Sequence, residues 1–179
     1  MTWKFDSLNY SPRAAELLAG GRLPELGPGS PNFAAAPLLK ALTVEFLFAG
    51  HRIADDKMAR CCLAALWLHH DFLDESHSIS QEIDTPTGSY WHAIMHRREP
   101  DAGNSKYWWH RVGSHPVFDL LKQYSPAAGH SFTTPQQFVD LCERVRGSGS
   151  VEEDAAKRVQ LLEWQLLFDW CWKRSLAKS

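Results

Sequence analysis

The C-terminal stretch 151–173 has the pattern of one long helix, and it constrains the fold more than any other feature of the chain. Its apolar side chains recur at near-helical spacing: Val159, Leu162, Leu166 and Trp170, with Leu161, Trp164, Phe168 and Cys171 widening the same face. A helix with so broad an apolar face is stable only when other elements cover it. We therefore expect this helix to be largely buried and the rest of the chain to pack around it.

The remainder of the chain also favours helices. No segment shows the sustained apolar–polar alternation that a half-buried strand requires. Ser11-Pro12 and Thr134-Pro135 each join a capping side chain to a proline suited to the first helical position. Helices are predicted over 13–19, 33–49, 55–77, 89–98, 105–112, 117–124 and 135–145. The sequence thus predicts an all-α protein, an irregular helical bundle built around 33–49, 55–77 and 151–173. Its 179 residues suit one core, so we assign 1–179 to a single domain.

Composition excludes several classes of protein. A hydrophobic fraction of 44% argues against a disordered chain, and a net charge of -2 gives no basis for nucleic-acid binding. No apolar run is long enough to span a membrane, and the first residues lack the apolar core of a signal peptide. The four cysteines form no CxxC pair and fall within apolar helical patterns, which favours reduced core thiols. We expect a soluble, cytoplasmic protein.

Two sets of three potential metal ligands share one spacing, at relative positions 0, 4 and 7. The first set is His70, Asp74 and His77, and the second is His92, His96 and Glu99. On a helix, such a triplet spans an arc of roughly 60°. Two facing helices that carry these sets would hold one or two divalent metal ions between them. The alternatives are a polar pocket without metal and a purely structural polar seam. The ExxH pattern of di-iron bundles is missing, which argues against an oxygenase.

The segment 96–111 combines basic and aromatic side chains near a break in the chain. Arginine offers a planar fork to carboxylate or phosphate, and tryptophan offers a stacking face. These types favour a pocket for an anionic or polyhydroxylated small molecule. Its predicted ligand-binding residues are Arg97, Arg98, Asn104, Lys106, Tyr107 and His110. The alternative is a structural network in which the two arginines pair with Glu99 and Asp101.

Three functional hypotheses follow. The leading one is a small-molecule enzyme or binding protein with a pocket of histidine, aspartate and arginine side chains that is compatible with metal dependence. A second is an HD-type metal-dependent phosphohydrolase, in which His70-Asp71 would act with His51 and Asp101. A third is a non-catalytic interaction domain that presents exposed aromatic side chains, Trp108, Trp109 and the neighbouring His110.

The choice of aspartate separates the first two hypotheses. On a continuous helix Asp74 shares a face with His70 and His77, whereas Asp71 points about 100° away from His70. The repeated spacing therefore predicts that Asp74 matters for binding and that Asp71 does not. The HD-type hypothesis predicts the reverse.

The middle third of the chain carries a resemblance. The segments TPTGSYWHAIMHRRE and NSKYWWHRVGSHPVF resemble a family of bacterial and fungal proteins to which no activity is attached. The resemblance implies that this region is the signature of such proteins, and it implies nothing about cofactor or substrate.

Overall fold

The computed structural model describes residues 3–177, and within that range the chain forms ten α-helices, two short 3-10 helices and no β-sheet. The predicted all-α fold is confirmed. The first five helices are α1 (Pro12–Leu18), α2 (Ala36–Ala41), α3 (Val44–Leu47), α4 (Asp56–His69) and α5 (Leu73–Ser80). The other five are α6 (Pro86–Arg98), α7 (Ala102–Val112), α8 (Val117–Tyr124), α9 (Pro135–Val145) and α10 (Val151–Ser175).

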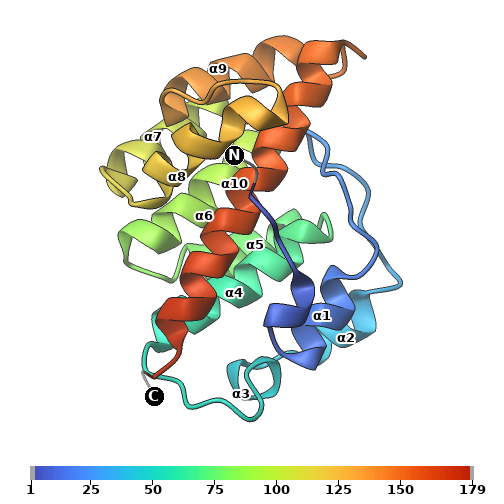
Figure 1. Cartoon of the computed structure of the whole chain (residues 1–179), viewed down its shortest axis with the longest axis vertical. Helices are drawn as coiled ribbons and strands as arrows, with labels where there is room; N and C mark the ends of the chain where they lie inside the picture. Colours follow the sequence, from blue (N-terminus) through green and yellow to red (C-terminus); the bar gives the residue numbers. More distant parts are fainter. Residues whose placement is uncertain (1–2, 178–179) are drawn as a thin grey trace.

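The long C-terminal helix predicted over 151–173 is present as α10, which runs along most of the molecule (Figure 1). It is tied to its neighbours by hydrogen bonds as well as by apolar packing. Trp164 Nε1 donates to the carbonyl of Ala65 on α4, and Trp91 Nε1 on α6 lies 3.4 Å from Cys171 Sγ. The N-terminal segment lies along the same helix, where the ring of Tyr10 packs 5.0 Å from that of Phe168. The broad apolar face of α10 is therefore covered from several sides.

Local capping chemistry explains where several helices begin. Ser11 accepts a hydrogen bond from the N–H of Ala14, and Thr134 accepts one from Gln137, as their cap-and-proline patterns predict. Thr85-Pro86 adds a third example, since Thr85 accepts from the N–H of Gly88. Each cap satisfies an N–H that has no partner within its helix. The four cysteines are buried and free, as predicted.

The single helix predicted over 33–49 is wrong. The segment forms two short helices, α2 and α3, separated by an extended Leu42. The hydroxyl of Thr43 accepts a hydrogen bond from the N–H of Phe46 and so caps a new helix in the middle of the apolar run. Periodicity concealed this break because the two helices together still bury apolar side chains such as Leu39 and Leu47.

The single helix predicted over 55–77 is also wrong. Helix α4 ends at His69, Asp71 adopts a left-handed conformation with φ of 64°, and α5 begins at Leu73. Aspartate tolerates this conformation better than most residues. The Asp71 carboxylate is held by Arg98 at 2.5 Å and by Arg22 at 2.5 Å, both distant in the sequence. Long-range ion pairs thus stabilise a break that no local signal predicts.

Gly88 allows the start of α6 to pack against the turn that precedes it. A Cβ at this position would lie 2.2 Å from the carbonyl oxygen of Ile83. We expect Gly88→Ala to lower the free energy of unfolding by about 1–3 kcal/mol, the usual cost of overpacking. The matched control is Gly103→Ala in the first turn of α7, where the new Cβ makes only ordinary contact at 3.5 Å. Urea denaturation checks both, and equal stabilities would contradict the packing argument.

No helix within residues 3–177 is both long and apolar enough to cross a membrane.

Candidate metal centre

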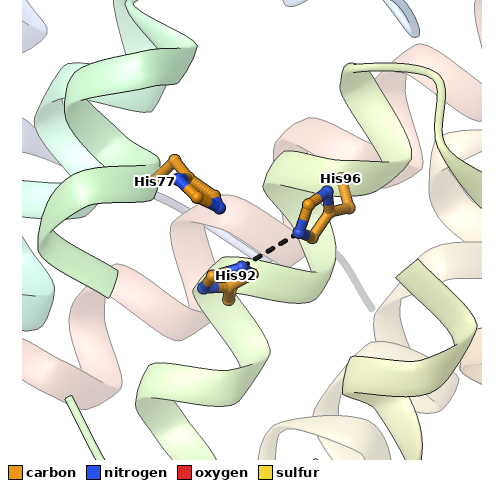
Figure 2. Close-up of side chains that lie close together, drawn as sticks. All are labelled: His77, His92 and His96. Carbon is orange, nitrogen blue, oxygen red and sulfur yellow. Dashed lines mark hydrogen bonds between the residues drawn. The ribbon is translucent and has the colours of Figure 1, made fainter. Parts of the chain in front are cut away.

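Three histidine side chains converge between α5 and α6. His77 projects from α5, and His92 and His96 project from successive turns of α6 (Figure 2). One ring nitrogen from each of the three lies within 4.8 Å of the others. The ring of His77 lies 4.6 Å from that of His92 and 5.4 Å from that of His96, measured between centroids. We call these three residues the histidine cluster.

Both ring nitrogens of His92 and of His96 have a neighbour within 3.5 Å. His92 Nε2 lies 2.9 Å from His96 Nε2, so one of the two nitrogens donates and the other accepts. His96 Nδ1 lies 2.8 Å from Glu99 Oε2, and His92 Nδ1 lies 3.5 Å from Ser80 Oγ. Histidines that bind metal commonly carry such a carboxylate or oxygen partner on the second nitrogen, where it orients the ring.

Burial keeps His92 neutral. Its side chain is buried, and Trp108 stacks on the ring at 4.0 Å. Burial, followed by the neighbouring His96 and His77, lowers the pKa of His92 to about 3. A neutral imidazole has a free nitrogen lone pair, which is the form that binds metal. His92 can therefore offer a nitrogen lone pair at neutral pH.

His70 and Asp74 lie outside this cluster. Their predicted alignment with His77 fails because the helix breaks at Asp71. His70 is buried, its Nε2 donates to the carbonyl of Leu17, and its Nδ1 accepts from the side-chain amide of Asn32. Burial lowers the pKa of His70. Asp74 is exposed in the first turn of α5. The first of the two spaced triplets therefore contributes only His77.

The second triplet stays together. His92, His96 and Glu99 form one chain of contacts along the end of α6. Glu99 precedes a proline but keeps a helical conformation as the C-cap residue, with φ of -66° and ψ of -4°. Its carboxylate therefore remains on the face of α6 that carries the two histidines.

The residues of the HD-type arrangement do not form one donor group among the described residues. The Asp71 carboxylate pairs with Arg98 and Arg22, and both ring nitrogens of His70 are engaged in the fold. Asp101 caps α7 by accepting from the N–H of Asn104. Among the described residues, the groups whose donor atoms could share a metal include neither His70 nor Asp71.

Arg97 and Arg98 face the protein interior rather than a ligand. Arg97 donates to Glu163 at 2.6 Å, and Arg98 donates to Asp71 at 2.5 Å and to the carbonyl of Leu68 at 2.9 Å. All of these side chains are buried. The predicted pairing of the two arginines with Glu99 and Asp101 is wrong. Carboxylates from distant parts of the sequence pair with the arginines instead.

The other predicted ligand-binding residues lie on α7. Asn104 is exposed and paired with Asp101, and Lys106 is paired with Asp140 at 2.5 Å. Tyr107 and His110 are exposed. Four different carboxylates thus engage the arginines, the lysine and the asparagine, and the structure does not bring the six side chains into one pocket.

The aromatic surface expected for an interaction domain is smaller than predicted. Trp109 is buried, with its ring 4.7 Å from that of Tyr90. Trp108 is half-buried against His92. Trp108 therefore belongs to the surroundings of the histidine cluster rather than to an open docking surface.

A solvent-open pocket of about 440 Å³ lies beside Glu99. Its lining includes four carboxylate side chains and two phenylalanine rings: Asp71, Asp74, Glu75, Glu99, Phe33 and Phe72. No basic side chain belongs to that lining. Glu99 belongs both to this lining and to the surroundings of the histidine cluster, because its Oε2 lies 2.8 Å from His96 Nδ1.

Sequence reasoning missed Asp101 as a neighbour of the cluster and Ser80 as a partner of His92. Asp101 forms a second group of potential metal ligands with His96 and Glu99, with donor atoms within 4.8 Å of one another. The spacing of His96, Glu99 and Asp101 was visible in the sequence, but the proline at position 100 hides the fact that the turn is tight. The backbone N–H of Asp101 donates to the carbonyl of His96 at 2.8 Å, which closes that turn.

No protein-family model, curated protein or solved structure matches the chain.

Proposed function

We propose that the protein is a metal-dependent enzyme acting on a small molecule, with a divalent transition metal ion bound by His77, His92 and His96. The observation that supports this proposal is the convergence of three imidazoles, two of which have an oxygen partner on the second nitrogen. Three protein ligands leave coordination positions for water or substrate, which is typical of a catalytic rather than a structural zinc site.

The spacing of the His92 and His96 nitrogens is close to what a metal of the zinc class requires. Two imidazole nitrogens bound to one tetrahedral Zn²⁺ lie about 3.3 Å apart, given Zn–N bonds of about 2.0–2.1 Å. The 2.9 Å between the Nε2 atoms of His92 and His96 is a few tenths of an ångström shorter. A small rotation of the rings would accommodate the ion, which would then replace the hydrogen bond between His92 and His96. Bound there, it would supply Lewis-acid chemistry.

The pocket beside Glu99 offers room for a substrate. The carboxylates of Asp74, Glu75 and Glu99 could accept hydrogen bonds from hydroxyl or ammonium groups, whereas that of Asp71 is already paired with Arg98 and Arg22. The phenylalanine rings could cover apolar parts of a ligand. With no basic side chain in the lining, this pocket favours a polyhydroxylated or cationic compound over an anionic one. The proposal therefore keeps the polyhydroxylated ligand predicted from the sequence and gives up the anionic one.

Metal titration of the full chain tests the proposal. After treatment with a chelator, the protein is titrated with Zn²⁺ in competition with a chromophoric chelator. We expect His77→Gln and His92→Gln to weaken the tightest equivalent by more than the roughly 10- to 100-fold that loss of an outer partner costs. Glu99→Gln, which changes the partner of His96, should weaken it within that range.

Asp74→Asn is the matched control, since Asp74 lies on the same helix as His77 but is exposed and outside the donor groups. It should leave the affinity unchanged. Circular dichroism confirms that each variant is folded. Equal Zn²⁺ affinity in the wild type and in folded His77→Gln would refute the proposed site.

A further inference from the structure

The imidazole of His96 faces potential metal ligands on both of its nitrogens. Nε2 lies in the histidine cluster, 2.9 Å from His92 Nε2. Nδ1 lies 2.8 Å from Glu99 Oε2, on the side where the carboxylate of Asp101 completes a second group of donor atoms within 4.8 Å. The buried ring of His96 thus belongs to two donor sets. One set consists of three histidine nitrogens, and the other consists of His96 Nδ1 and two carboxylates.

The backbone holds the second donor set in place. Glu99 is the C-cap residue of α6, and Asp101 is the N-cap residue of α7. The N–H of Asp101 donates to the carbonyl of His96, which ties the two caps together. Asn104 occupies part of the Asp101 carboxylate, but a carboxylate has about four lone-pair sites and keeps capacity for a cation. The donor atoms of the three groups already lie within 4.8 Å of one another.

The two sides of His96 differ in exposure and in chemistry. His92 is buried on the inner side, whereas the side chain of Glu99 is 49% exposed on the outer side. Two carboxylates and one imidazole suit harder divalent ions such as Mn²⁺ as well as Zn²⁺, whereas three imidazoles favour Zn²⁺ or Cu²⁺. The outer set also carries two negative charges close to the solvent, which favour the approach of a cation.

We propose that His96 bridges two metal ions, one in the histidine cluster and one held by His96 Nδ1, Glu99 and Asp101. The proposal rests on the proposed function, because the inner ion is the one described above. Binding of the outer ion replaces the hydrogen bond between Nδ1 and Glu99, and the ring proton leaves to solvent, so that the bridge is an imidazolate. Metal–nitrogen bonds of about 2 Å on opposite sides of the ring place the two ions about 6 Å apart.

Elemental analysis and electron paramagnetic resonance of the full chain test the bridge. Chelator-treated protein is loaded with Zn²⁺ or with Cu²⁺ and then desalted. We expect two ions per chain in the wild type and one in Asp101→Asn. Asparagine caps helices as well as aspartate does, so this variant should fold. Two Cu²⁺ ions that share an imidazolate are magnetically coupled, so the second equivalent should reduce the resonance signal of the first in the wild type but not in the variant.

The outcomes separate the two proposals. If the wild type and Asp101→Asn each bind one ion per chain, and His77→Gln binds none, the bridge is overturned and the inner site remains supported. No bound ion in the wild type overturns both. If the wild type and Asp101→Asn both bind two ions, the second ion lies elsewhere and the bridge is overturned. Two Cu²⁺ ions without magnetic coupling in the wild type would also overturn it, because His96 would then not be shared.

Discussion

Acidification from about pH 7 to about pH 5.5 is expected to lower the unfolding free energy of the metal-free protein by about 4 kcal/mol at most. Three buried histidines whose pKa values are lowered most account for the larger part of this loss. Burial is the largest cause that lowers the pKa of His69 to about 3, that of His92 to about 3 and that of His115 to about 4. In the unfolded chain the same groups titrate near pH 6.5.

The sign follows from the number of bound protons. Between pH 6.5 and the lowered pKa of the folded state, the unfolded chain binds protons that the native protein does not. Stability is therefore fully present above pH 6.5 and is lost as the pH falls. Each of the three histidines contributes at most about 1.3 kcal/mol over this interval.

Urea denaturation at the two pH values, in the presence of a chelator, measures the loss. His69→Phe should reduce it by about a third, because the substitution keeps a ring against Trp164, 4.8 Å away, and removes one titrating group. His110→Phe is the matched control on the exposed face of α7 and should leave the loss unchanged. Equal stability of the wild type at both pH values would contradict the assignment of neutral, buried histidines.

Glu163→Gln is expected to lower the unfolding free energy by about 3–5 kcal/mol. Glu163 and Arg97 are fully buried and paired at 2.6 Å, and Glu163 also accepts from the hydroxyl of Tyr90. Two further nitrogens of Arg97, Nε and Nη1, have no hydrogen-bond partner. Glutamine keeps the shape and an acceptor oxygen but removes the charge, which leaves the guanidinium uncompensated in the core. The Arg97 guanidinium also lies over the Phe138 ring, 4.7 Å from its centroid, and this contact offsets only part of the cost of the unpaired charge.

The matched control is Glu152→Gln. Glu152 forms a bidentate pair with Arg144 at 2.7 and 2.8 Å on the surface, and such a pair is worth at most about 1 kcal/mol. Replacing both members of the buried pair, as in R97M/E163M, should recover most of the loss, because no unpaired charge remains. Chemical denaturation checks all three variants. A loss in Glu163→Gln no larger than in Glu152→Gln would show that the buried pair contributes little.

The sequence by itself predicted those features that local interactions determine. The side-chain period of α10 and the caps at Ser11 and Thr134 depend on neighbours within a few residues, so they could be identified without the fold. The same is true of the His92–His96 pair, which stands on successive turns of one helix. These residues contributed two of the three members of the histidine cluster.

Only the tertiary structure decided the rest of the site. The break at Asp71 depends on Arg98, 27 positions away in the sequence, and on Arg22, 49 positions away. That break removes His70 from the face of His77, and the packing of α5 on α6 brings His77 to the other two histidines. The partners of Arg97 and Arg98 were unpredictable for the same physical reason. A buried charge is stabilised by whichever opposite charge the fold brings within reach, and sequence spacing carries no information about a partner on a distant helix.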